Sequence, residues 1–312
     1  MRFAVEKVHI VEVGPRDGLQ NENVTIPTDA KVAFITALSD AGLKTIEAGA
    51  FVHPKWVPQM ADTAEVYKLI PKDPGVDFPV LVPNARGLDR AIEAGVQSIS
   101  IFTAASETFN KKNINMSIEE SIQNFSSMVP RALANGMKVR GYVSCVVGCP
   151  YEGEVAPEKV LEVTARLLDL GCHEVSLGDT IGVGTPLQVQ GLLSLMLEVI
   201  PVHALAMHFH DTRGIALVNT VAALEMGIYT FDASAGGLGG CPYAPGASGN
   251  MATEDLVYLM NGLGIETGVD LDLLVRASSA IAGYLDHPLP GRVLQAHSKG
   301  SARMSDASAV VH

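Results

Sequence analysis

The chain has 312 residues and a formal net charge of -12, without a block of lysine and arginine. This charge argues against a nucleic-acid partner, because phosphate binding relies on clustered cations. Hydrophobic residues make up 47% of the chain and charged residues 18%, which suits one large folded core rather than disorder. Because no apolar run reaches the roughly 18 residues of a membrane span and no secretory segment opens the sequence, we expect a cytoplasmic protein without a membrane partner.

The four cysteines are consistent with a reducing compartment. They are Cys145, Cys149, Cys172 and Cys241. We expect free thiols, since disulfides are rare in cytosolic proteins of this length. The C-x3-C pair lacks a second pair that would complete a structural zinc site.

Eight β-rich segments alternate with helical stretches along the chain. The expected strands are Val8–Val13, Thr45–Ala48, Phe78–Pro83, Ser98–Thr103, Lys138–Ser144, His173–Leu177, Ala204–His210 and Tyr229–Ser234. Helix starts are indicated by the capping box Ser117-x-x-Glu120 and by Pro157 and Pro186 at first-turn positions. The first strand runs into Gly14–Gly18 (GPRDG) rather than into a dinucleotide-binding glycine fingerprint. The pattern therefore predicts an α/β fold of the (β/α)8 TIM-barrel type.

One domain accounts for most of the chain. Helical patterning continues from about Thr253 to Tyr284, and a proline-containing segment then breaks it. We expect a catalytic barrel over residues 1–285 and a short C-terminal extension over residues 286–312 that is partly disordered.

Polar residues that close the strands are the candidates for chemistry, because the carboxyl ends of barrel strands form the active face. They are Arg16, Asp17, Glu47, Asp179, His208, His210, Cys241 and Asn250. Side chains of residues that are two positions apart on a strand face the same side, so His208 and His210 can hold one metal ion. For an isolated motif of this kind, a pair of structural histidines is the commoner explanation. Asp17 and Asn250 favour the metal site, since two nitrogen and two oxygen donors suit Mg²⁺ or Mn²⁺ and also accept zinc.

Three other candidates have two interpretations each. Arg16 can stabilise developing negative charge or form an ion pair that caps the barrel, and Glu47 can orient Arg16 or serve as a salt-bridge partner. Cys241 follows the glycine-rich stretch 236–240, which predicts a mobile loop carrying a thiol that can donate a proton. A buried inert cysteine, and a phosphate-cradling role for the glycines, are the alternatives.

Five blocks of the sequence match one known family: Val11–Glu22 (VEVGPRDGLQNE), Phe51–Met60 with PKWVPQM, Arg140–Pro150 (RGYVSCVVGCP), Cys172–Pro186 (CHEVSLGDTIGVGTP) and Phe231–Asn250 with its GGLGGCP motif. In these blocks the sequence resembles the 3-hydroxy-3-methylglutaryl-CoA lyase family of the DRE-TIM metallolyase superfamily. The likeness covers roughly Val8 to Gly268.

This resemblance implies a divalent-metal lyase that splits 3-hydroxy-3-methylglutaryl-CoA into acetyl-CoA and acetoacetate, as in leucine degradation and ketone body formation. It implies Asp17, His208, His210 and Asn250 as metal ligands. Catalytic roles are expected for Arg16, Asp17, Glu47, His208 and Cys241, and substrate contacts for Arg16, Gln20, Tyr142, Asp179 and Thr180. We also expect a homodimer.

The chain departs from the family pattern at Asn23, at Gly49-Ala50 and at His53. These changes bear on the CoA contacts and the acyl group rather than on the metal set, so a longer-branched substrate such as the isohexenyl analogue is one alternative. A synthase that condenses acetyl-CoA with a 2-oxo acid is a second, and a barrel that binds a CoA ester without turnover is a third.

Overall fold

The structure, a computed structural model, describes residues 3–240 and 249–297. Within them, nine parallel strands form a sheet in the order β2-β1-β9-β8-β7-β6-β5-β4-β3. The strands are β1 (His9–Glu12), β2 (Thr45–Ile46), β3 (Gly49–Ala50), β4 (Val80–Leu81), β5 (Ser98–Ala104), β6 (Lys138–Ser144), β7 (Glu174–Asp179), β8 (Leu205–Phe209) and β9 (Thr230–Ala233).

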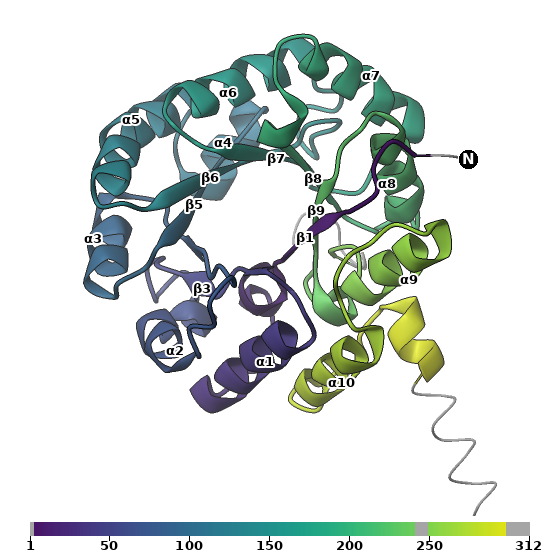
Figure 1. Cartoon of the computed structure of the whole chain (residues 1–312). Coiled ribbons are helices and arrows are strands. Elements are labelled where there is room, and N and C mark those ends of the chain that lie inside the picture. Colours follow the sequence, from purple (N-terminus) through teal and green to yellow (C-terminus); the bar gives the residue numbers. More distant parts are fainter. Residues whose placement is uncertain (1–2, 241–248, 298–312) are drawn as a thin grey trace, which may run out of the picture.

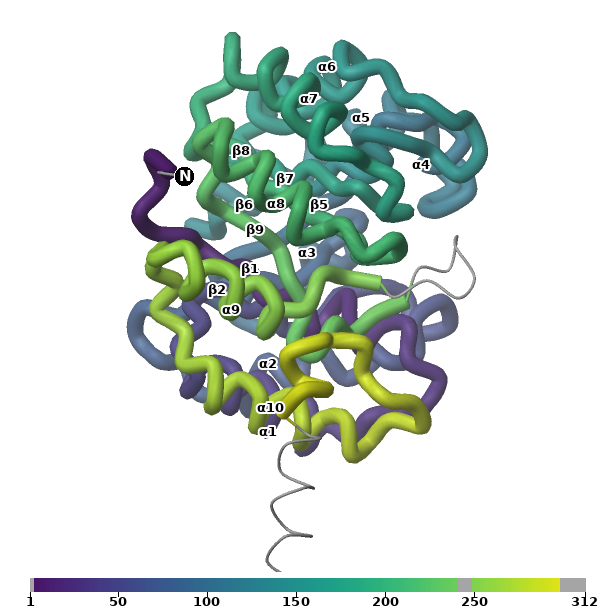
Figure 2. The backbone as a smooth tube through the Cα atoms, turned by 90° about the vertical axis from the view of Figure 1, so that its right-hand side faces the viewer, coloured from purple at the N-terminus to yellow at the C-terminus, as the bar shows by residue number. Residues whose placement is uncertain are grey.

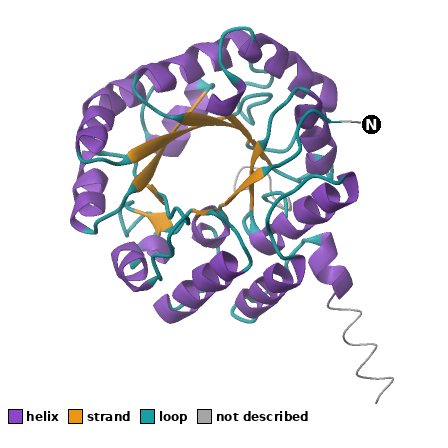
Figure 3. Cartoon of the chain, in the orientation of Figure 1, coloured by secondary structure: helices purple, strands orange, loops and turns teal. Residues whose placement is uncertain are grey.

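The two ends of this sheet belong to one stretch of chain. β2 pairs with β1, and β3 pairs with β4. Between them, the Glu47 amide donates to the Glu12 carbonyl and the Ala48 amide donates to the Pro79 carbonyl. The expected strand over Thr45–Ala48 is therefore two short strands, and the linking residues close the ring that Figure 3 shows end-on.

Helices surround the barrel of strands (Figure 1). They are α1 (Thr28–Asp40), α2 (Thr63–Leu69), α3 (Ala85–Glu93), α4 (Glu107–Ile114), α5 (Ile118–Ala134), α6 (Pro157–Asp169), α7 (Pro186–Leu197), α8 (Ala216–Glu225), α9 (Thr253–Leu263) and α10 (Leu271–Ala282). The elements η2 (Pro58–Met60), η3 (Val202–Ala204) and η4 (Ala235–Gly237) are short 3₁₀ turns, and η1 (Gly14–Gly18) is a single π-helical turn. The (β/α)8 TIM-barrel prediction is confirmed, which fixes the carboxyl ends of the strands as the face to search for a site.

Local sequence signals account for the helix boundaries. Ser117 and Glu120 form the expected capping box at the start of α5, and Pro157 and Pro186 occupy the first turns of α6 and α7. The single helical pattern expected from Thr253 to Tyr284 is two helices, because Gly264 adopts a left-handed conformation that ends α9.

The last helices complete the ring. α10 lies beside α1, as both views show (Figures 1 and 2), so the end of the barrel sequence packs against its beginning. Beyond α10, the side chains of Leu289 and Leu294 are buried in the main core. The division of the chain at residue 285 stays a prediction. Among the described residues, we find no helix that is long and apolar enough to cross a membrane.

Candidate functional site

The turn after β1 brings two charged side chains to the mouth of the barrel. The carbonyl of Val13 accepts hydrogen bonds from the amides of Arg16, Asp17 and Gly18 at 3.2, 2.7 and 3.1 Å. These bonds wind η1 tightly around one acceptor, so that consecutive residues both line the cavity at the strand ends. The sequence motif had predicted the two charges but not the π-helical turn that places them.

Arg16 lies between two carboxylates. Its Nε is 2.5 Å from Oε2 of Glu47, and its Nη1 is 2.5 Å from Oδ1 of Asp17. Glu47 is fully buried and also accepts a hydrogen bond from the Tyr142 hydroxyl at 3.4 Å. The guanidinium of Arg16 is thus held by the fully buried carboxylate of Glu47 and by the partly exposed carboxylate of Asp17.

Asp17 also belongs to a second group of side chains. One ligand atom each from Asp17, His208 and His210 lies within 4.8 Å of the others, which is the spacing of a shared metal ion. Asn250 joins this group, because its amide donates to Oδ2 of Asp17 at 2.9 Å and its segment forms a bridge with His210. The four predicted ligands therefore meet at one point, although they come from η1, from the end of β8 and the residue after it, and from the segment before α9.

Two atoms of this group lack the hydrogen bonds that burial ordinarily demands. Nδ1 of His210 and Oδ1 of Asn250 are both buried and have no hydrogen-bond partner. An unsatisfied buried acceptor is costly unless something else occupies it. Together with the carboxylate and the second imidazole, these atoms make a donor set that fits a divalent cation with mixed nitrogen and oxygen ligands.

The electrostatics of the cluster keep Asp17 and His210 deprotonated. Burial by itself would raise the pKa of Asp17, but the charge of Arg16, the two histidines and the Asn250 amide outweigh it and lower that pKa to about 2. Burial, reinforced by His208 and opposed by Asp17, lowers the pKa of His210 to about 3. A carboxylate and a neutral imidazole are the forms that bind a metal ion at neutral pH.

A cavity of about 990 Å³ opens above the cluster. Its lining includes Arg16, Asp17, Gln20, Tyr142, Thr180, His208 and His210, so most of the predicted catalytic and substrate-binding residues do share one space. The far part of the lining comes from the loop that carries His53 and Trp56 and from α4, which carries Lys111 and Lys112.

Asp179 is placed differently from the other candidates. It is not among the described residues that line the cavity, and its two carboxylate oxygens accept the amides of Val183 and Gly184 at 3.0 and 2.8 Å. Alternation along β7 turns Ser176, Gly178 and then Thr180 toward the cavity and Asp179 away from it. Its contacts therefore shape the loop after β7.

Cys241 falls outside the described residues, whereas Cys145, Cys149 and Cys172 are buried free thiols.

Sequence reasoning missed a buried polar chain beneath the site. Asp232 on β9 contacts Arg140, Ser176 and His208, and Arg140 continues to Glu174. The sequence did carry a signal for this chain of contacts, because Asp232 is a carboxylate within the short buried strand Thr230–Ala233 (TFDA). A charge at such a position can be buried only with partners, which sequence alone does not identify.

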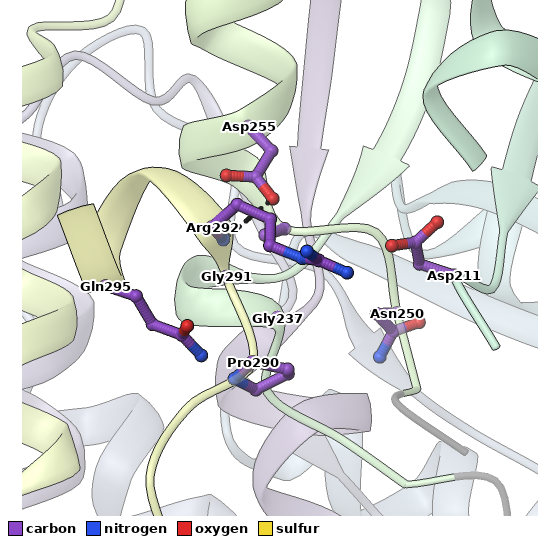
Figure 4. Close-up of a pocket in the computed structure, with 9 residues that line it drawn as sticks. Asp211, Gly237, Asn250, Asp255, Pro290, Gly291, Arg292 and Gln295 are labelled. Atoms are coloured by element: carbon purple, nitrogen blue, oxygen red, sulfur yellow. Dashed lines mark hydrogen bonds between the residues drawn. The ribbon is translucent and has the colours of Figure 1, made fainter. Parts of the chain in front are cut away.

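The C-terminal segment lines a second, smaller cavity, which Asn250 also lines. Figure 4 shows Arg292 and Gln295 on one side of a small cavity, with Asn250 and Asp211 on the other. The amide of Gly291 donates to the carbonyl of Gly236 at 2.9 Å, so this segment is bonded to η4 at the base of the glycine-rich stretch.

Fold and site together define a TIM-barrel protein with a candidate divalent-metal site at the carboxyl ends of its strands. A sequence model of the HMGL-like family matches residues 7–281. The chain belongs to this family. It is 58% identical to the mitochondrial hydroxymethylglutaryl-CoA lyase of Bos taurus and 54% identical to the cytoplasmic 3-hydroxy-3-methylglutaryl-CoA lyase of Rattus norvegicus, in both cases over 94% of this chain, and over 90% and 86% of the relatives.

Solved structures agree with the family assignment. The HMG-CoA lyase of Bacillus subtilis is 49% identical with a TM-score of 0.93, over 96% of this chain and 100% of that one. An HMG-CoA lyase from Acinetobacter baumannii, solved with coenzyme A and 3-methylmalate, is 40% identical with a TM-score of 0.90, over 95% and 97% of the two chains. The carboxyl transferase domain of Rhizobium etli pyruvate carboxylase, at 17% identity, shares the fold alone.

Proposed function

We propose that the protein is a lyase that cleaves 3-hydroxy-3-methylglutaryl-CoA into acetyl-CoA and acetoacetate by a metal-assisted retro-Claisen reaction. The observation that carries this proposal is the meeting of Asp17, His208, His210 and Asn250 beside Arg16, in a chain more than half identical to named lyases of this substrate. The C3 hydroxyl gives up its proton with the assistance of Asp17, whose carboxylate accepts it, and the hydroxyl oxygen becomes the ketone oxygen of acetoacetate. The C2–C3 bond breaks with its electrons passing to C2, and the resulting thioester enolate takes up one proton.

The residues divide this work by position. Arg16 lines the cavity and faces the space where the enolate oxygen would develop negative charge, and Glu47 holds the guanidinium in place. When held by Asp17, His208, His210 and Asn250, a divalent ion such as Mg²⁺ or Mn²⁺ supplies the Lewis acidity that lowers the pKa of the substrate hydroxyl. Gln20, Tyr142 and Thr180 bound the acyl part of the cavity, and Asp179 acts on substrate indirectly through the loop that it orders.

Cys241 is proposed as the proton donor to the enolate carbon. Its place in the chain supports this role, since it directly follows Gly240, which lines the cavity. A thiol near its ordinary pKa is protonated at neutral pH and can give up that proton to a carbanion.

The outer part of the cavity suits the CoA portion of the substrate. Lys111 and Lys112 supply local cations in a chain of net charge -12, and CoA carries its negative charge on phosphates. Trp56 offers an indole that is 85% exposed on the same lining, and an aromatic ring of this kind can stack on adenine.

The departures from the family pattern bear unequally on the acyl group. Gly49 and Ala50 are buried against Thr63, whose hydroxyl bonds both the amide and the carbonyl of Ala50, and neither is among the described lining residues. His53 does line the cavity. Of these departures, His53 is therefore the one in direct contact with the cavity, and it belongs to the loop proposed here for the CoA portion, so nothing in the described lining favours a longer branch over the methyl group.

The test measures acetoacetate and acetyl-CoA formed from 3-hydroxy-3-methylglutaryl-CoA with Mg²⁺, with Mn²⁺ and with chelator, beside the isohexenyl analogue. We expect metal-dependent cleavage of the methyl substrate, abolished in His208→Ala and retained in His203→Ala, whose side chain is exposed. Cleavage of neither substrate would refute the proposal, and cleavage of the analogue alone would reassign the acyl group.

Other properties are proposed on narrower grounds. The relatives include mitochondrial and cytoplasmic enzymes, and we propose a cytoplasmic location for this chain. A homodimer, a role in leucine degradation and ketone body formation, and a barrel domain ending near residue 285 complete the proposal. Size-exclusion chromatography with light scattering tests the dimer.

A further inference from the structure

Asp232 is a buried carboxylate directly beneath the candidate metal site. It lies on β9 opposite His208 of β8 in the strand register, and its side chain has no exposed surface. A carboxylate at such a position is tolerated only if its oxygens are hydrogen-bonded and its charge is matched. Its partners therefore indicate what the charge is for.

Each oxygen of Asp232 has a distinct environment. Oδ1 faces Nη2 of Arg140 at 2.7 Å. Oδ2 accepts a hydrogen bond from the Ser176 hydroxyl at 2.7 Å and a longer one from Nη1 of Arg140 at 3.4 Å, and it lies 3.2 Å from Nδ1 of His208. The side of the carboxylate toward the metal site is thus occupied by one hydroxyl and one imidazole.

Arg140 does not neutralise Asp232 by itself. Its Nε donates to Glu174 at 2.7 Å, so one guanidinium serves two carboxylates. The group of Arg140, Glu174 and Asp232 therefore carries one surplus negative charge, and His208 is in contact with it. A carboxylate that faces a guanidinium and a hydroxyl donor carries no proton of its own and can only accept, so the hydrogen bond to His208 requires a proton on Nδ1.

The two histidines of the cluster differ in this respect. Nδ1 of His210 is buried and has no hydrogen-bond partner, whereas Nδ1 of His208 has Asp232. Their rings are 5.2 Å apart, and both contribute a ligand atom to the same group. Within the described residues, His208 is thus the histidine whose Nδ1 is held by a side chain from outside the cluster.

We propose that Asp232 is a positioning residue that holds His208 as the Nδ1-protonated tautomer and so leaves the lone pair of its Nε2 free as the ligand atom of the site. The proposal rests on the metal-binding role of His208 proposed above. An anionic partner behind an imidazole also makes the free nitrogen a stronger base and ligand. Asp232 contributes in this way without touching metal or substrate.

Asp232→Asn provides the discriminating variant. Because the oxygen of the new amide would face Arg140, its NH2 group would occupy the place of Oδ2 and donate to Nδ1 of His208, which moves the imidazole proton to Nε2. We expect Mn²⁺ binding, measured by titration with electron paramagnetic resonance, to weaken by about 10- to 100-fold. Ser176→Ala is the matched control, since it removes a hydrogen bond to the same oxygen and leaves the Asp232–His208 contact; it should weaken binding less than Asp232→Asn does.

The tautomer can also be observed without any variant of Asp232. In ¹⁵N-histidine spectra of the metal-free wild-type protein, the His208 signals, assigned by their loss in His208→Gln, should show protonated Nδ1 and unprotonated Nε2. An Nε2-protonated ring, or Mn²⁺ affinity in a folded Asp232→Asn protein equal to that of the wild type, would overturn the proposal. Neither readout uses thioester cleavage, so each remains decisive if the proposed reaction is wrong.

Discussion

Replacing Glu12 with glutamine changes a buried carboxylate that joins three parts of the site's scaffold. Oε1 of Glu12 accepts the amides of Gly14 and Ala235 at 2.7 and 2.9 Å, and Oε2 accepts the Thr253 hydroxyl at 2.6 Å. The carboxylate thereby links η1, η4 and the start of α9. Burial, only partly offset by these three hydrogen bonds and reinforced by the nearby charge of Glu254, raises the pKa of Glu12 from 4.5 to about 7.

The sign of the effect follows from the direction of that change. A carboxyl group whose pKa is higher in the folded than in the unfolded state binds its proton more tightly when folded, so it stabilises the protein at low pH. That stabilisation is complete below pH 4.5 and is lost as the pH rises through about 7. A pKa displaced from 4.5 to about 7 corresponds to about 3 kcal/mol of unfolding free energy.

The assay is urea denaturation of the wild type and of Glu12→Gln at pH values from 5 to 8. The wild type should lose about 2.5 kcal/mol more stability across this range than the variant, because glutamine does not titrate. Glu198→Gln is the control, since Glu198 is exposed and its replacement should leave the wild-type pH dependence unchanged. If Glu12→Gln and the wild type follow parallel curves, Glu12 does not titrate in this range and the reasoning from its burial is wrong.

Three further predictions concern the site itself. Glu47→Gln should lower kcat by about 100-fold in a steady-state assay, because the guanidinium loses the partner that orients it, and an unchanged kcat would contradict the anchoring role. Gly249→Ala should weaken Mn²⁺ binding in a titration, because a Cβ atom there would collide with the carbonyl oxygen of Gly239, whereas Gly262→Ala, with open space around it, should bind Mn²⁺ normally. Trp56 is the sole tryptophan, so its fluorescence should change on addition of CoA but not of pantetheine, and an unresponsive signal would place the adenine elsewhere.

The fold could be predicted because strand and helix signals alternate regularly along the chain. Pro157 and Pro186 were correctly placed in first helical turns, because proline fixes its own backbone angle whatever surrounds it. The splitting of Thr45–Ala48 into β2 and β3 was not predictable, because it depends on hydrogen bonds to Glu12 and Pro79 from distant parts of the chain.

The candidate site divides in the same way. Asp17, His208, His210 and Asn250 could be named from motifs, because a metal site requires particular ligand atoms and those residue types are few. The partners that hold them could not, since Asp232 and Glu12 are single carboxylates whose contacts come from other strands and turns. Asp179 was expected to contact substrate because of its place in a motif. The sequence did not indicate that its carboxylate oxygens accept hydrogen bonds from the loop after β7.

The sequence by itself thus determined the barrel and the family and named a candidate ligand set, because periodicity and residue chemistry are local properties of the chain. The tertiary structure decided which side chains meet. In the folded chain, the π-helical turn directs Arg16 and Asp17 into one cavity, and Asp232 on β9 faces His208 on the neighbouring strand β8. Such contacts depend on register and on the closure of the sheet, which are properties of the whole fold.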